Sequence, residues 1–115
     1  MQTYKKMLLQ KLTDNGWEMI SQSSACDWWL EEYWTIKSVR NHWGLELLVL
    51  FLVDPQFEGQ HKNQGVRSIT VTTEMPSDWI AAENGLALIT IIGSFEKQAD
   101  HLLETINYYR STATD

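Results

Sequence analysis

The stretch from Leu45 to Val53 constrains the fold of this 115-residue chain more than any other segment. It reads Leu-Glu-Leu-Leu-Val-Leu-Phe-Leu-Val, which is apolar at nearly every position and rich in residues that favour strands. At the edge of a sheet such a run would promote aggregation, so we expect a central strand with a neighbour on either side. Asp54-Pro55 ends the run, because proline cannot donate to a sheet ladder.

Helical periodicity is found at both ends of the chain. Residues 3–14 predict one helix, and Gly16 follows as the residue that ends it in a left-handed conformation. A second helix is predicted from an N-cap at Ser94 to Arg110, whose positive charge suits the last turn, and residues 111–115 read as a frayed tail. The apolar stripe of the second helix consists of Phe95, Ala99, Leu102, Leu103, Ile106 and Tyr109.

Between the helices, the pattern predicts about five strands joined by short connections. Besides the central strand these are residues 17–21, 28–40, 66–73 and 86–92, with a hairpin turn at 41–44 and a helical turn near 78–83. Short connections favour antiparallel neighbours, and the terminal helices most simply pack on one face of the sheet. We therefore predict a single two-layer α+β domain over residues 1–115, with one core.

The charge balance argues against two classes of partner. The formal net charge is −6, and the nine basic residues are spread thinly, whereas proteins that bind nucleic acid usually cluster theirs. An anionic membrane surface is disfavoured for the same reason, and no apolar run approaches the roughly 20 residues of a membrane span. One cysteine allows no internal disulfide. We expect a cytoplasmic protein that binds neither nucleic acid nor membrane.

The chain shows no motif of a metal, cofactor or catalytic site. Phosphate-binding glycine motifs are absent, as is the nucleophile motif G-x-S-x-G. No pair among Cys26, His42, His61 and His101 has the spacing of metal ligands. We therefore expect no metal, no cofactor and no catalytic residues, and we interpret the cysteine as an inert small hydrophobe.

Six tryptophans are the strongest functional signal in the sequence. Trp17 and Trp34 are most simply core residues, and Trp79 falls in a connection. Trp28 and Trp29 are adjacent, so on a strand they face opposite ways, and a sheet with one dry face leaves at least one of them partly exposed. We expect the same of Trp43 in its turn. Exposed tryptophans on an acidic surface are typical of protein contact sites.

Glu31 and Glu32 are the second signal. Neighbouring strand residues point to opposite faces, so the two carboxylates are not expected to act on one substrate. Strict alternation places Glu32 on an apolar face with Trp28, Leu30, Trp34 and Ile36. There it needs Lys37, Arg40 or a partner group, or it keeps its proton. Glu32 is interpreted either as an inward charge that protects a strand edge, which we favour, or as an anchor for a ligand.

Part of the chain resembles small bacterial proteins that carry no assigned function. The resemblance rests on the stretch from Gly16-Trp17-Glu18 to Glu32-Tyr33-Trp34 and on Phe51-Leu52-Val53-Asp54-Pro55, about half of the chain. The resemblance implies a bacterial cytoplasmic protein and implies nothing about activity.

These observations favour two hypotheses of different classes. The first is a non-enzymatic, adaptor-like or chaperone-like domain that binds another protein or itself as a homodimer, through Trp28, Trp29 and Trp43. The alternative is a small-ligand-binding domain whose tryptophan-lined pocket is anchored by Glu32.

Overall fold

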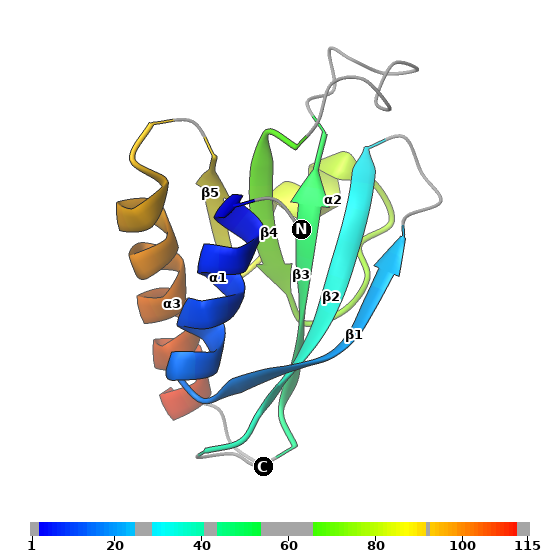
Figure 1. The fold of residues 1–115 in the computed structure, drawn as a ribbon. Helices are drawn as coiled ribbons and strands as arrows, with labels where there is room; N and C mark the ends of the chain where they lie inside the picture. The colour runs from blue at the N-terminus through cyan, green and yellow to red at the C-terminus, as the bar shows by residue number, and fades with distance from the viewer. Residues whose placement is uncertain (1–2, 25–28, 41–43, 54–65, 92, 113–115) are drawn as a thin grey trace.

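A computed structural model describes residues 3–24, 29–40, 44–53, 66–91 and 93–112 of the chain (Figure 1). The predicted helix over 3–14 and the predicted order of elements are confirmed. The elements are α1 (Thr3–Asp14), β1 (Trp17–Ser24), β2 (Leu30–Ser38), β3 (Glu46–Leu52), β4 (Ser68–Thr72), α2 (Trp79–Glu83), β5 (Ala87–Thr90) and α3 (Phe95–Thr112).

The five strands form one sheet in chain order, β1-β2-β3-β4-β5, and every neighbouring pair is antiparallel. The apolar run predicted to be central is β3, which has a strand on either side. Both long helices, α1 and α3, lie on the same face of this sheet (Figure 1). The predicted α+β two-layer architecture is therefore confirmed.

The main core lies between these two helices and the sheet. The largest side chains in it are Trp17 and Trp34, both fully buried as predicted, and the Trp34 ring meets Phe51 edge-on with ring centroids 4.7 Å apart. The helices contribute Leu8, Leu12, Ala99, Leu102, Leu103 and Ile106. This apolar layer fixes both helices against the sheet, and the face of α3 that it buries is the predicted stripe.

The opposite face of the sheet carries a second, smaller apolar cluster, so the prediction of a single core was wrong. The short helix α2 covers part of this face, and its N-cap Asp78 accepts a hydrogen bond from the Ala81 backbone N–H at 2.8 Å. Where α2 lies over the sheet, this part of the second face is dry as well. The second cluster consists of Trp29, Leu30, Leu50, Leu52 and Ala82.

A bulge near the start of β2 corrects the strict alternation predicted for that strand. Leu30 pairs with Leu52 and Glu32 pairs with Phe51, so one extra residue lies between them on β2. The extra residue moves Leu30 to the α2 face, whereas Glu32, Trp34 and Ile36 share the α1 face. Periodicity cannot reveal such an insertion, because a bulge changes the strand's phase without a sequence signal of its own.

The turn from α1 into β1 is built around Gly16, which has the predicted positive φ, at +80°. Arg110 of α3 is buried here and donates to the Asn15 and Gly16 carbonyls, at 2.9 and 3.2 Å, while its guanidinium lies 4.5 Å from the Trp17 ring centroid. Arg40 donates to the Asp14 carbonyl at 2.9 Å. Two cations thus bind carbonyls at the C-terminal end of α1, where the helix dipole is negative.

Gly16→Val is expected to lower the free energy of unfolding by about 1–2 kcal/mol, since a β-branched residue is strained at positive φ. A Cβ at this position would also lie 2.4 Å from Cδ of Arg40. Urea denaturation measures the loss. Gly44→Val is the matched control, because Gly44 has a φ of +93° but open space around its Cβ position. An equal loss in both variants would show that contact with Arg40 adds nothing.

None of the helices in the described part of the chain is both long and apolar enough to cross a membrane.

Candidate functional site

The four predicted site residues do not form one site in the described structure. Trp28 and Trp43 lie outside the described residues. Trp29 is only 6% exposed and belongs to the cluster under α2. Glu32 lies on the other face of the sheet, beside α1. In the described structure the tryptophan that contacts Glu32 is Trp34, and its ring is buried. Glu32 and an exposed tryptophan therefore do not form a site among the described residues.

Glu32 is bound by Lys5, a partner that the sequence analysis missed. The Lys5 ammonium donates to Oε1 of Glu32 and, at 2.7 Å, to Oε1 of Glu31. The other oxygen of Glu32 accepts from the Trp34 indole at 2.9 Å and from the Gln22 amide at 2.8 Å. The bulge explains why neighbouring carboxylates meet one ammonium, contrary to the prediction that they would face apart.

Neither cation expected beside Glu32 lies there. Lys37 is paired in register with Glu18, and Arg40 binds the end of α1. Lys5 was overlooked because it is almost 30 residues away in sequence and lies on a helix whose other lysines are more exposed. Only the packing of α1 across the sheet brings it to β2.

The hydrogen bonds of this cluster favour the charged forms of Lys5 and Glu32. Burial by itself would lower the pKa of Lys5, but the hydrogen bonds to Glu31 and Glu32 raise the pKa above its ordinary value. Burial would likewise raise the pKa of Glu32, but the hydrogen bonds from Lys5, Gln22 and Trp34 lower the pKa below its ordinary value. Both oxygens of Glu32 are engaged within the chain, which favours the structural interpretation over the ligand anchor.

Two polar hollows lie on the described surface. One, of about 410 Å³, borders the Lys5 cluster and is lined by Gln22, Ser23, Ser24, Glu31 and Glu32. The other, of about 480 Å³, lies between the end of β4 and α2 and includes Glu74, Met75 and Asn84. The linings of both hollows, as described, contain no aromatic ring, so neither matches the tryptophan-lined pocket of the alternative hypothesis.

The two edges of the sheet differ in how they are protected. The β5 edge is only four residues long, and Gln98 of α3 accepts a hydrogen bond from the Thr90 backbone N–H at 2.8 Å. The β1 edge is eight residues long, and no described strand pairs with its outer side. Natural sheets usually shield such edges with charges, proline, bulges or a covering element. The β1 edge has one charged residue, Glu18, and a bulge between Met19 and Ser21.

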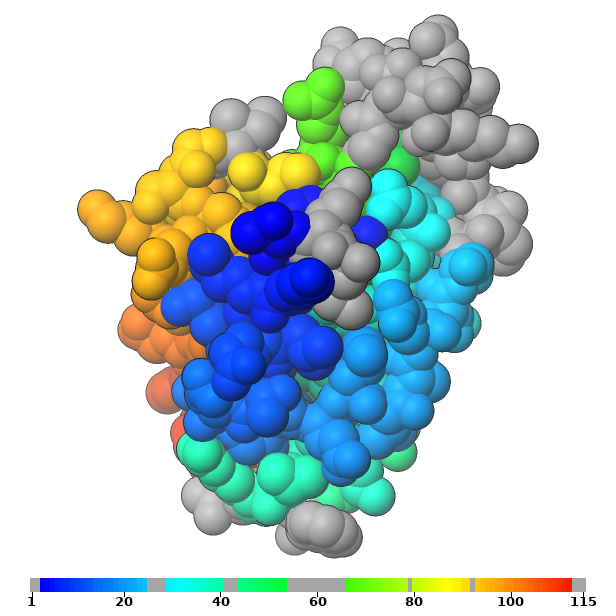
Figure 2. Space-filling view, viewed as in Figure 1, coloured from blue at the N-terminus to red at the C-terminus, as the bar shows by residue number. Residues whose placement is uncertain are grey.

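An apolar groove runs along the inner side of this edge, between α1 and β1. It has a volume of about 470 Å³, and its rim includes Val39, which is 40% exposed. Figure 2 shows the surfaces of α1, in dark blue, and β1, in lighter blue, side by side on this face. The groove is lined by Leu9, Thr13, Trp17, Glu18, Met19 and Val39. An unpaired backbone beside an apolar groove is the arrangement that accepts an added strand.

The outward direction of the β1 backbone follows from its pairing with β2. The Val39 N–H donates to the Gly16 carbonyl at 2.9 Å, so Gly16 and, two residues later, Glu18 direct their backbone groups toward β2. Trp17 and Met19 therefore present N–H and C=O groups to the open side. These groups lie directly beside the groove.

Comparisons with protein-family models, with curated proteins and with solved structures found no match to this chain. Among the residues that the structure describes, no three His, Cys, Asp or Glu side chains gather as they would around a metal ion. The site must therefore be interpreted from its own geometry, and the open edge of β1 with its groove is the feature that this geometry singles out.

Proposed function

We propose that this protein is a non-enzymatic, adaptor-like or chaperone-like interaction domain that binds another protein by adding its partner's strand to β1. The observation that carries the proposal is the contrast between the two edges of the sheet. The β5 edge is short and bonded by Gln98, whereas the β1 edge offers the outward backbone of Trp17 and Met19 beside an apolar groove. The acidic composition and the single cysteine support a cytoplasmic setting, which we propose as well.

In strand addition, the backbone and the side chains of the partner make different contributions to binding. Hydrogen bonds along the edge supply affinity independently of sequence, and pockets for alternate side chains supply specificity. The bulge after Met19 interrupts the regular edge, so a partner strand aligns with one side of it. The groove borders residues 17–19, which precede the bulge. We therefore place the added strand along this part of β1, centred on Glu18.

This proposal moves the contact surface away from the predicted tryptophans. Trp29 is buried, and the groove takes its apolar character from Leu9, Met19, Val39 and one face of Trp17 instead. From the original hypothesis we keep a negative charge at the contact surface, because Glu18 is the one charged residue among the described residues that line the groove.

The test uses peptides selected from a random library displayed on phage, with the purified protein as bait. Enriched peptides are expected to bind at least tenfold more weakly to Val39→Asp, because a carboxylate on the rim must be desolvated when the groove fills. Leu88→Asp is the matched control: Leu88 is 43% exposed, close to the 40% of Val39, but lies on the β5 edge. We expect this control to bind like the wild type.

Two results would contradict the proposal. One is a selection that enriches no peptide above an unrelated bait protein. The other is an equal effect of Val39→Asp and Leu88→Asp on every enriched peptide, which would place the binding surface elsewhere. Amide hydrogen exchange on the complex gives an independent readout, since a bound strand slows exchange of the outward N–H groups of Trp17 and Met19.

A further inference from the structure

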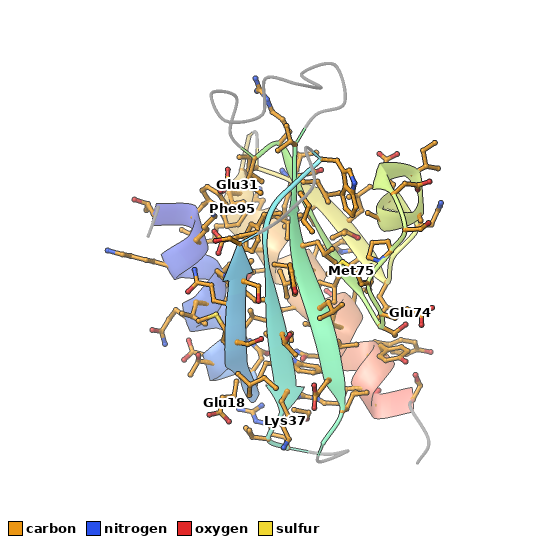
Figure 3. The ribbon with its side chains drawn as sticks, turned by 90° about the vertical axis from the view of Figure 1, so that its right-hand side faces the viewer. Glu18, Glu31, Lys37, Glu74, Met75 and Phe95 are labelled. Carbon is orange, nitrogen blue, oxygen red and sulfur yellow. The ribbon has the colours of Figure 1, made fainter. Side chains whose placement is uncertain are left out.

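A row of alternating charges runs across three strands of the sheet, from β3 to the open edge at β1. Glu46 of β3 pairs in register with Lys37 of β2, and Lys37 pairs with Glu18 of β1. All three lie on the face away from α1 and α3, because their neighbours Ile36 and Leu47 are buried beneath those helices. Figure 3 shows Glu18 and Lys37 at the same end of the β1–β2 pair.

The order of signs in this row is negative, positive, negative. Opposite charges directly across a strand pair stabilise it, and like charges destabilise it. Glu46–Lys37 and Lys37–Glu18 are therefore both pairs of opposite charge. Among the described residues, the exposed Glu18 has a cation opposite it in register only on its β2 side. A strand added beyond β1 continues the favourable pattern when it places a positive charge opposite Glu18.

The geometry of pairing strengthens this preference. Because Trp17 and Met19 provide the outward hydrogen bonds, Glu18 faces the added strand at a position without them. Side chains at such positions are the closest across an antiparallel pair, with Cα atoms about 4.5 Å apart. The charge of the residue opposite Glu18 is therefore felt at short range.

We propose that the partner of β1 is an extended segment that carries lysine or arginine opposite Glu18, flanked by an apolar residue on each side. This inference rests on the proposed function and specifies the partner. The two flanking residues oppose Trp17 and Met19, whose side chains point to the α1 side of the sheet. They consequently point into the groove, where Leu9 and Val39 receive them.

A second copy of β1 does not fit this description. The strand reads Trp-Glu-Met-Ile-Ser-Gln-Ser-Ser and contains no lysine or arginine, so β1 against β1 leaves both copies of Glu18 without a new cation. Two copies would also bring together chains that each carry a net charge of −6. A basic segment of a different protein matches both the row and the overall charge.

The experiment compares selections from the same displayed library on three baits: the wild type, Glu18→Gln and Glu18→Lys. On the wild type we expect enriched peptides to share an apolar–basic–apolar core, and exchanging its basic residue for glutamate should weaken binding about fivefold. On Glu18→Gln the preference for a basic residue should disappear, and on Glu18→Lys it should change to aspartate or glutamate. Added salt should reduce the wild-type preference, because Glu18 is exposed.

The possible failures are distinguishable. Peptides that are sensitive to Val39→Asp but carry no basic residue, or whose preference is the same on all three baits, would overturn this inference and leave the proposed function standing. If no peptide is sensitive to Val39→Asp, the proposed function fails and the inference fails with it. Sedimentation equilibrium of the wild type is expected to show a monomer, and a dimer that Val39→Asp dissociates would overturn the choice of partner.

Discussion

Replacing Trp34 by alanine is expected to lower the free energy of unfolding by about 4 kcal/mol, the largest effect that we predict for any single substitution. Trp34 is fully buried, contacts the Phe51 ring, and donates its indole N–H to Glu32 at 2.9 Å. The alanine variant leaves a cavity in the layer between the sheet and α1, which the surrounding side chains fill only in part. Urea denaturation followed by far-ultraviolet circular dichroism measures the loss without relying on tryptophan fluorescence.

Two further variants keep this prediction testable if Trp34→Ala does not fold. Trp34→Phe retains a ring against Phe51 but loses volume and the hydrogen bond to Glu32, and should cost about 1–2 kcal/mol. Tyr108→Ala removes an aromatic ring that is 70% exposed and should leave stability nearly unchanged. A loss for Trp34→Phe no greater than that for Tyr108→Ala would contradict the central role of this side chain.

Lys5→Met is expected to destabilise the protein by about 3 kcal/mol at neutral pH, because it leaves the partly buried Glu32 carboxylate beside Glu31 without a cation. Lys11→Met is the matched control on the same helix. Lys11 binds Asp100 at 2.6 Å, but the Asp100 side chain is 63% exposed, so breaking that pair should cost under about 1 kcal/mol. Adding Glu32→Gln to Lys5→Met should recover part of the loss. Equal effects of the two lysine substitutions would contradict the assignment.

The pH dependence of stability reports the same cluster. The folded state lowers the pKa of Glu32 below its ordinary value of 4.5, so the stabilisation is complete above that value and is lost as the pH falls through the lower folded value. The folded state raises the pKa of Lys5 above 10.5, so that contribution is complete below 10.5 and is lost only at higher pH. Glu32→Gln should therefore flatten the acid limb of the wild-type curve.

The cluster also shows how a residue can be singled out correctly while its role depends on the fold. Glu32 is conspicuous in the sequence because it interrupts an apolar pattern, and such a charge needs a partner. The identity of the partner could not be read from the strand. Lys5 reaches it across the α1–sheet interface, and the bulge in β2 turns Glu31 toward the same ammonium.

The location of the proposed interaction surface, in contrast, could not be predicted from the sequence. The prediction of exposed tryptophans requires a sheet with one dry face, whereas α2 covers part of the second face and buries Trp29 there. Apart from Trp17, which is buried, the open edge of β1 contains no aromatic residue, and its sequence, half of it small or amide residues, resembles an ordinary surface strand. Only the strand order reveals that nothing described pairs with it and that Gln98 protects the opposite edge.

The sequence by itself determined the order of elements, the central position of β3, the placement of both long helices on one face, and the left-handed turn at Gly16. Each of these depends on local periodicity, on the cost of exposing an apolar run, or on a glycine's freedom at positive φ. Tertiary structure alone decided the buried cations Lys5 and Arg110, the second apolar cluster and the charge row that ends at Glu18. These depend on contacts between residues far apart in the chain, on strand register, and on a bulge, none of which a one-dimensional pattern contains.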